Sequence, residues 1–526
     1  MKKILKNNWQ ILALEFTVLC IFIFFYGKFG DSMVDSFREV YIPQQILNGN
    51  APYKDIFVIY PPLSYLINTF FIKIFGSSIN VFYTLGLLST MGIIYLSNKI
   101  SKILLDKNFA FGIGLFLLAG LVLSPNVFNS IFPYSYGITY GLLFILTSIL
   151  FVLNKKFPLG YLFYSLAILC KYEFLLLLPL LFFYTHKTSI WKNLLSLFSP
   201  MFLTFGILKI QGLNFEDIKT SFDIIALISK TKTLAYFYSV MGIKFNWALI
   251  PIYLSKFFNF ILPIIFITLI QKAIKSLQEK KFGLVLNCKA INTLIYGTIF
   301  LALLFFNTHY QESLIFVFPL IIILFIARYN VLSSNEKFFI IASLLISAKV
   351  FFALTLQSYG IYFLPFALIS LSILIPEKFK KSFLSFLVIL GLAITIQNGS
   401  ILYKKASTPH KKVIEYVKNN TSIDDKVLVL PECLGINVLT ERTSDNKFYS
   451  LIPLYVETFG EKIIIKRLEK TKPNFIIINN YDTSAYYYRE FGTDYAQEIL
   501  KWIKENYILQ ETINDKWVFK IYKRIN

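Results

Sequence analysis

Long apolar runs recur along most of this 526-residue chain and constrain its fold more than any other feature. A run of roughly 15–20 apolar residues is long enough to cross a lipid bilayer as a helix. Such runs predict thirteen helices, near residues 10–27, 80–98, 109–124, 138–153, 158–170, 173–185, 194–209, 254–271, 291–306, 312–327, 337–355, 360–375 and 382–398. The expected fold class is therefore mainly α, a polytopic membrane helix bundle.

The distribution of positive charge supports this arrangement and gives it a direction. The net charge of +22 would suggest a nucleic-acid partner in a soluble domain, but here the lysines flank the apolar runs, so no nucleic acid is expected. Turns at 125–137, 307–311 and 356–359 contain no lysine or arginine. Because positive residues gather on the cytoplasmic side, the N-terminus is expected there. An odd number of spans then places the C-terminal tail outside the cell membrane.

Three outward segments, 28–79, 210–253 and 399–526, are too long to be simple connections. The first includes a predicted surface helix over 61–75, and the second reads as an amphipathic lid. From about residue 403 the chain has the periodicity of a soluble α/β domain, with helices expected over 410–420, 461–470 and 495–505 and strands over 426–430, 475–478 and 517–522. We therefore expect a transmembrane module over 1–402 and an extracytoplasmic α/β domain over 403–526. The tail contains no phosphate loop or nucleophile motif, so a binding or capping role is expected.

The first outward segment concentrates charge directly after an apolar run. If 34–47 is a helix, Asp35 and Glu39 lie one turn apart with Arg38 beside both. Arg38 is the only arginine before Arg328 in a chain that otherwise uses lysine, which suggests a bidentate contact with a carboxylate or phosphate. The group is a candidate catalytic cluster, and an ordinary salt bridge on a solvated helix face is the alternative.

Ionisable residues inside or beside apolar helices supply further candidates. Lys171 and Glu173 lie where one apolar helix ends and the next begins, and Lys349 lies about two turns inside another. Such residues are costly in a membrane and usually mark a site or a partner. A lipid phosphate is one anion that these lysines could bind. Snorkelling of Lys171 to the interface and an internal pair between Lys349 and a carboxylate are the alternatives.

Tyr60 and Asp55 of the first segment, and His309, Tyr310 and Tyr359 in two short turns, are candidate substrate-binding residues. For the aromatic residues in the turns, membership of an interfacial belt is the competing interpretation. No histidine-based metal site is visible. A divalent cation, Mg²⁺ or Mn²⁺, held by oxygen atoms of Asp31, Asp35 and Glu39 is an open alternative.

The first segment also carries a motif. Its sequence VDSFRE (34–39), followed by ILNGNAPYKDIFVIYPPLSY, resembles the GT-C superfamily of polytopic membrane glycosyltransferases, in particular family-39-like proteins related to protein mannosyltransferases and aminoarabinose transferases. The pair in KYE (171–173) and the extracytoplasmic tail also fit this resemblance. Only the first segment is specific, and it lacks the adjacent Asp-Glu pair of many relatives.

The resemblance implies transfer of a sugar from a polyprenyl-phosphate carrier to a glycan, lipid or protein acceptor at the outer face of the cell membrane. It implies that Asp35 is the general base for the acceptor hydroxyl, with Glu39 as the alternative. Lys171, Arg38 or Lys349 would stabilise the departing lipid phosphate. A transporter or lipid flippase of cell-envelope precursors is the competing class, although no internal repeat of spans is visible. A non-catalytic assembly protein is the third interpretation.

Overall fold

The computed structural model describes residues 2–31, 33–125, 129–186, 188–240, 250–279, 318–348 and 363–525. Within these ranges, four helices are long and apolar enough to cross a membrane: α4 (Ile79–Leu104), α6 (Tyr136–Leu153), α9 (Ile190–Ile210) and α20 (Glu377–Lys404). The predicted spans that they match are those near 80–98, 138–153, 194–209 and 382–398. The predicted helix near 291–306 lies outside the described residues.

Other apolar helices of the described chain pack beside these four. They lie at the positions of the remaining helices predicted within the described ranges. They are α1 (Lys2–Phe24), α5 (Lys107–Leu117) with the π-helix η1 (Leu118–Val122), α7 (Phe157–Cys170), α8 (Leu178–Thr185), α12 (Ile250–Glu279), α15 (Phe318–Arg328) with the 3₁₀-helix η5 (Tyr329–Val331), α16 (Ser334–Ile346) and α19 (Leu364–Leu374). One prediction differs in detail, because the run 173–185 begins as a 3₁₀-helix, η2 (Tyr172–Leu177), before α8 starts. Pro179 stands in the first turn of α8, where the missing N–H costs nothing.

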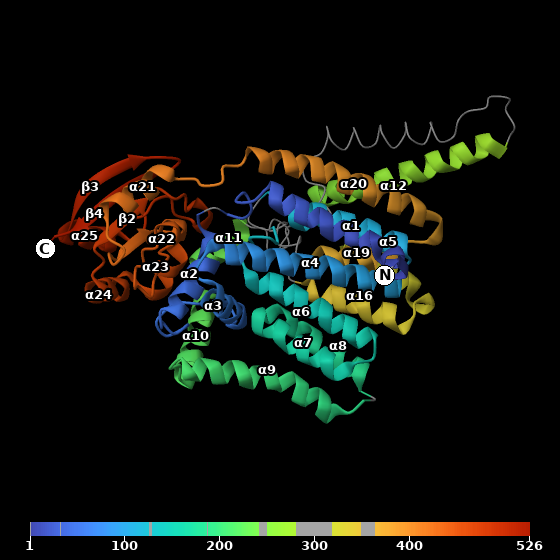
Figure 1. Cartoon of the computed structure of the whole chain (residues 1–526), viewed down its shortest axis with the longest axis horizontal. Coiled ribbons are helices and arrows are strands. Elements are labelled where there is room, and N and C mark those ends of the chain that lie inside the picture. The colour runs from blue at the N-terminus through green and yellow to red at the C-terminus, as the bar shows by residue number, and fades with distance from the viewer. Residues whose placement is uncertain are drawn as a thin grey trace.

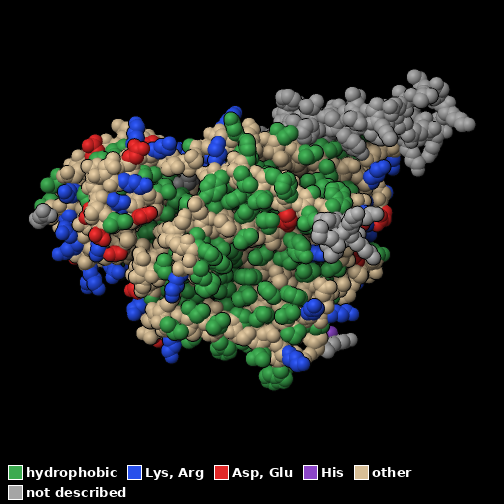
Figure 2. Space-filling model, viewed as in Figure 1, with side chains coloured by type: hydrophobic (Ala, Val, Ile, Leu, Met, Phe, Trp, Pro, Cys, Tyr) green, Lys and Arg blue, Asp and Glu red, His purple; other side chains and the backbone are tan. Residues whose placement is uncertain are grey.

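Large hydrophobic side chains remain exposed on the outer surface of this bundle, as expected for helices that face lipid. Phe16 and Phe24 of α1 are 66% and 67% exposed, and Phe202 of α9 is 73% exposed. Figure 2 shows hydrophobic side chains spread across the helical part, while charged side chains gather over the C-terminal domain and the opposite end. An apolar surface of this extent would not persist in water, so the bundle is a membrane domain.

The outward segments form helices that lie between the bundle and the C-terminal domain. They are α2 (Asp35–Leu47) and α3 (Leu63–Phe75) from the first segment, and α10 (Phe215–Ile228) and α11 (Lys232–Val240) from the second. The helix predicted over 61–75 is thus present as α3, whose buried face includes Tyr65 and Asn68. In Figure 1 these helices lie at the end of the bundle that faces the C-terminal domain, away from the N-terminus.

The C-terminal domain is an α/β unit around a four-stranded sheet of order β1-β2-β4-β3. Its elements are α21 (Lys411–Asn420), β1 (Val427–Leu430), α22 (Leu434–Thr440), α23 (Pro453–Phe459), α24 (Glu461–Thr471), β2 (Phe475–Asn479), the 3₁₀-helix η7 (Ser484–Tyr486), α25 (Gln497–Asn506), β3 (Tyr507–Asn514) and β4 (Val518–Arg524). Strand β1 pairs parallel with β2, and β4 is antiparallel to both of its neighbours. Each predicted helix and strand of the tail is present, while α22, α23 and β3 were not predicted.

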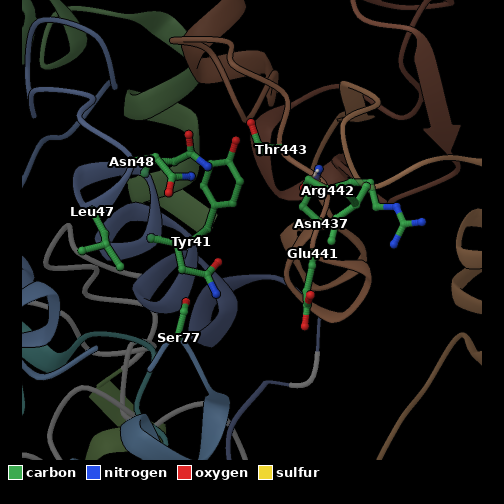
Figure 3. A pocket seen from close by; sticks show the side chains of 11 residues that line it. Tyr41, Leu47, Asn48, Ser77, Asn437, Glu441, Arg442 and Thr443 are labelled. Atoms are coloured by element: carbon green, nitrogen blue, oxygen red, sulfur yellow. Dashed lines mark hydrogen bonds between the residues drawn. The ribbon is translucent and has the colours of Figure 1, made fainter. Parts of the chain in front are cut away.

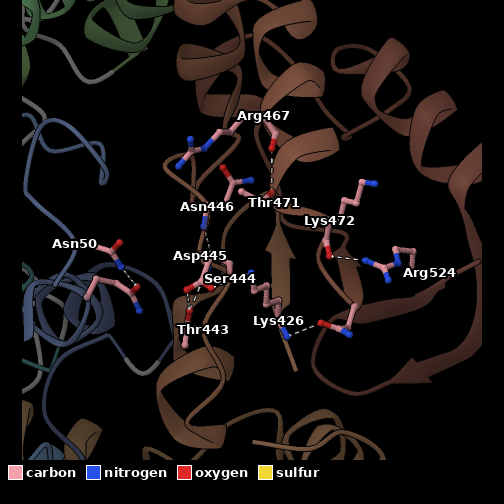
Figure 4. A network of polar contacts seen from close by, with 12 residues as sticks. Asn50, Lys426, Thr443, Ser444, Asp445, Asn446, Arg467, Thr471, Lys472 and Arg524 are labelled. Atoms are coloured by element: carbon pink, nitrogen blue, oxygen red, sulfur yellow. Dashed lines mark hydrogen bonds and ion pairs between the residues drawn. The ribbon is translucent and has the colours of Figure 1, made fainter. Parts of the chain in front are cut away.

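The first outward segment and the C-terminal domain share a hydrophobic core. Met33 and Val34 pack with Cys433 and Ile436 of the C-terminal domain, and all four are buried. The Tyr41 hydroxyl of α2 lies 2.9 Å from the hydroxyl of Ser444. The loop that holds Ser444 is itself braced by the 3.2 Å ion pair between Lys426 and Asp445 (Figure 4). The C-terminal domain is therefore docked firmly on α2.

Candidate active site

The candidate site begins at the first turn of α2, whose start is fixed by Asp31. One carboxylate oxygen of Asp31 accepts a hydrogen bond from the Met33 N–H, and the other accepts one from the Asp35 N–H, both at 3.1 Å. These N–H groups have no partner inside the helix, so Asp31 satisfies them from outside. Gly30, at φ +74°, lets the backbone turn here where a side chain would collide with the Phe132 carbonyl oxygen. The turn holds Asp35 in a defined position.

Arg38 connects α2 to the start of α6. Its Nη1 donates to Asp35 Oδ1 at 3.1 Å and its Nη2 donates to the Tyr134 carbonyl at 3.0 Å. The guanidinium also lies 5.5 Å from the ring centre of Tyr60, over the aromatic face. Its side chain is only 12% exposed. The predicted role of Arg38 as a specific contact rather than a solvated charge agrees with this geometry.

Glu39 is completely buried and both of its carboxylate oxygens are occupied. Oε1 accepts from the Tyr65 hydroxyl at 3.2 Å, and Oε2 accepts from the Tyr136 N–H at 2.8 Å. Tyr136 is the first residue of α6, so the carboxylate satisfies a free N–H at a helix N-terminus. Burial raises the pKa of Glu39, against the opposing influence of Arg38 and these hydrogen bonds. Glu39 anchors α2 on α6.

Asp35 has a different environment. Its side chain retains 38% of its surface, whereas that of Glu39 retains none. Desolvation by the surrounding protein raises the pKa of Asp35, Arg38 opposes this shift, and Asp31 adds to it. A carboxylate of raised proton affinity, held by one arginine contact and still open to solvent, is suited to accept a proton. Of the two predicted bases, only Asp35 has side-chain surface exposed to solvent.

Lys171 joins this cluster from the bundle, as predicted. Its Nζ lies 4.3 Å from the ring centre of Tyr60 and 3.7 Å from Glu173 Oε1, and its side chain is 9% exposed. The junction between α7 and η2 can approach because Gly137 of α6 has no side chain, and a Cβ there would lie 2.7 Å from the Cys170 carbonyl oxygen. Tyr60 thus lies between two cations, Arg38 and Lys171, and its backbone carbonyl accepts from the Tyr53 hydroxyl.

Other predicted residues lie elsewhere. Asp55 closes its own turn, with Oδ2 accepting a hydrogen bond from the Ala51 N–H at 3.0 Å. Lys349, His309, Tyr310 and Tyr359 lie outside the described residues. The sequence interpretation missed Glu432, which follows β1 in the C-terminal domain and is 8% exposed. Its charge interacts with those of Asp35, Arg38 and Asp31, so it faces the same site.

The predicted oxygen ligands of a divalent cation are engaged with groups of the protein. Asp31 and Glu39 already accept hydrogen bonds on both oxygens, and the guanidinium of Arg38 occupies the position of a counter-cation between Asp35 and Glu39. Among the described residues, no group of three histidine, cysteine or carboxylate side chains could hold a metal.

A separate cavity of about 350 Å³ lies between the carboxyl half of α2 and the C-terminal domain (Figure 3). Amide, hydroxyl and carboxylate side chains line it, among them Gln44 and Asn48 of α2 and Asn437 and Glu441 of the C-terminal domain. Arg442 is committed to backbone carbonyls, including that of Thr421 at 2.7 Å. Asp35, Arg38 and Lys171 do not line this cavity, so it is distinct from the candidate active site.

The fold and the site together define a polytopic helical membrane protein with a cluster of carboxylates and cations where its bundle meets an α/β domain. No protein-family model matches the chain, and no curated protein matches it by sequence. Among solved structures, it is similar to ArnT from Cupriavidus metallidurans bound to undecaprenyl phosphate, with 11% identity, a TM-score of 0.45 and 98% of both chains covered. It is also similar to the oligosaccharyltransferase AglB from Archaeoglobus fulgidus in complex with an inhibitory peptide and a dolichol-phosphate. That match has 11% identity and a TM-score of 0.46, and covers 99% of this chain and 75% of that one.

Proposed function

We propose that this protein is a membrane glycosyltransferase that moves a sugar from a polyprenyl-phosphate carrier to an acceptor hydroxyl at the outer face of the cell membrane. The observation that carries the proposal is the pairing of an accessible carboxylate, Asp35, with two largely buried cations, Arg38 and Lys171, around the ring of Tyr60. The sequence motif of the first outward segment supports the same reaction class.

Asp35 would act as the general base. The acceptor oxygen forms a bond to the anomeric carbon of the sugar while its proton passes to the Asp35 carboxylate. The bond between the anomeric carbon and the phosphate oxygen breaks, and its electron pair stays with the lipid phosphate. Attack opposite the leaving group inverts the anomeric configuration. This assignment needs no covalent enzyme intermediate.

Lys171 and Arg38 would stabilise the negative charge that develops on the departing phosphate. Cations in a site that excludes water interact with such charge more strongly than cations in solution. Lys171 is the better placed of the two for a lipid carrier, because it lies at the end of α7, an apolar helix of the bundle. Arg38 already holds Asp35 and α6, so its main contribution is to keep the base in position.

Asp35→Asn tests the proposal directly. The amide has the same shape but cannot accept the proton, so the rate of sugar transfer from a radiolabelled polyprenyl-phosphate donor should fall about 100- to 10,000-fold. Thermal unfolding in detergent should be nearly unchanged. Asp223→Asn, at an exposed position of α10, is the matched control and should retain the wild-type rate. Full activity in Asp35→Asn would exclude Asp35 as the base.

A further inference from the structure

Glu432 is held in place by the backbone at the end of β1. The Asn479 side chain of β2 donates to the Glu432 carbonyl at 3.2 Å, and the Leu451 N–H donates to the Pro431 carbonyl at 2.8 Å. Both contacts fix the direction in which the chain leaves the sheet. Glu432 is buried at this point, with 8% of the residue exposed.

A direct backbone contact brings Glu432 to the Asp35 site. The Gly435 N–H donates to the Met33 carbonyl at 2.8 Å. Gly435 lies three residues after Glu432, and Met33 lies two residues before Asp35. The approach is so close that a Cβ at Gly435 would lie 2.9 Å from both the Cα and the sulfur of Met33. The two carboxyl groups are therefore placed by the same junction between the domains.

The surroundings of Glu432 contain more negative than positive charge. The first outward segment contributes Asp35, Asp31 and Arg38, and the described residues provide no ion pair for Glu432. The ionisable groups around it from the C-terminal domain are Cys433, Tyr449, Tyr455, Tyr481, Tyr486 and Tyr495, which are all neutral when protonated. Burial, and then the charge of Asp35, raise the pKa of Glu432 to about 8. Its carboxyl group therefore retains a proton to higher pH than an exposed glutamate does.

We propose that Glu432 is a positioning residue of the candidate active site, which makes the C-terminal domain part of the catalytic unit. In its protonated form it presents a neutral carboxyl group beside Asp35. In its ionised form it adds a negative charge to the site where the phosphate of the donor binds, and so weakens donor binding. This inference rests on the proposed transferase activity and adds a pH-sensitive group to it.

The pH profile of sugar transfer tests this role. For the wild-type protein, kcat/KM for the polyprenyl-phosphate donor should decline as the pH rises through the pKa of Glu432, by at most about tenfold per pH unit, and level off at the lower value of the ionised form. Glu432→Gln keeps a neutral group of the same shape at every pH, so this alkaline decline should be lost. Glu432→Asp restores a titrating carboxyl group and should restore a decline. Glu415→Gln, at an exposed position of α21, is the matched control and should keep the wild-type profile.

The outcomes separate this inference from the proposed function. If wild-type protein transfers sugar and Asp35→Asn does not, but Glu432→Gln declines at alkaline pH as the wild type does, the role of Glu432 is wrong and the transferase assignment stands. If the wild-type protein transfers no sugar from polyprenyl-phosphate donors, the proposed function itself fails. Thermal unfolding of each variant shows whether a lost rate reflects lost folding.

Discussion

Asp35 and Glu39 lie one turn apart on α2, yet their carboxylates have opposite surroundings. Glu39 accepts hydrogen bonds from Tyr65 and Tyr136 and has no exposed surface, whereas Asp35 is 38% exposed and contacts one arginine. The sequence placed both on one helical face, where either could be the base. The difference arises from α6, because the N–H of its first residue, Tyr136, donates a hydrogen bond to Glu39 and not to Asp35. Residue spacing within α2 could not reveal it.

Glu39→Gln tests whether the Glu39 carboxylate has a structural role rather than a catalytic one. Glutamine can accept only one of the two hydrogen bonds, and its NH₂ group would face a second donor. We expect a loss of about 2 kcal/mol in the free energy of unfolding, together with a lower thermal midpoint. Differential scanning fluorimetry would measure the shift. An unchanged midpoint with abolished transfer would instead assign catalysis to Glu39.

Residue chemistry made part of the site predictable. Lys171, Glu173 and Arg38 were identified because charges are costly at apolar helix ends and because arginine is rare in this chain. The structure brings Arg38 and Lys171 to Tyr60, and Glu173 pairs with Lys171. Glu432 gave no such signal. It is a single glutamate after a strand, in a domain where charge is ordinary, and its significance comes only from its neighbours in space.

At the scale of elements, α22 is the helix that couples the two domains. It follows Glu432 directly, packs against α2, and places Gly435 on the Met33 backbone. The tail prediction omitted α22 because a run of seven residues is too short to show helical periodicity. Strand β3 was missed for a related reason, since its residues are mostly exposed and do not alternate. The fully buried strands β1 and β2 and the amphipathic helices α21, α24 and α25 were predicted correctly.

The methyl group added by Gly435→Ala should push α22 away from the first outward segment. The new Cβ would lie 2.9 Å from the Met33 Cα, a backbone atom that cannot rotate away as the Met33 side chain can, so we expect Asp35 and Glu432 to move apart. A displacement of roughly 1 Å would lower the rate of sugar transfer by about 100-fold. Gly206→Ala on α9 is the matched control, because nothing lies within 4 Å of its added Cβ. Equal rates for both variants would show that the junction tolerates displacement.

At the scale of the whole molecule, the first outward segment and the C-terminal domain behave as one folding unit. Lys405, between α20 and the C-terminal domain, donates to the backbone carbonyls of Gly30 and Pro125 and so ties the linker to the first outward segment. Glu457 of α23 accepts from the Lys232 N–H at 2.9 Å, which adds the second outward segment. Regions joined in this way are expected to lose the protection of their backbone amides against hydrogen exchange together.

Hydrogen–deuterium exchange of Lys405→Met tests whether the two regions open together. We expect faster deuterium uptake in residues 33–46 and in residues 434–440, by the same factor in both, while the interior of α4 keeps its wild-type rate. Mass spectrometry of peptic fragments would measure the uptake. Lys404→Met is the matched control, since its side chain is exposed and adjacent. Independent rates in the two regions would contradict a single unit.

The contact between Tyr41 and Ser444 spans 403 positions of the chain, and this separation has a consequence for biosynthesis. At a ribosomal rate of about 5–20 residues per second, the first outward segment emerges roughly 20–80 s before the tail that completes its core. During that interval Met33 and Val34 lack the residues of the C-terminal domain against which they pack, and Glu432 has not yet been made. Under the proposed function, the site of a nascent chain is incomplete until the C-terminal domain has folded, so synthesis itself would delay the first use of a lipid-linked donor.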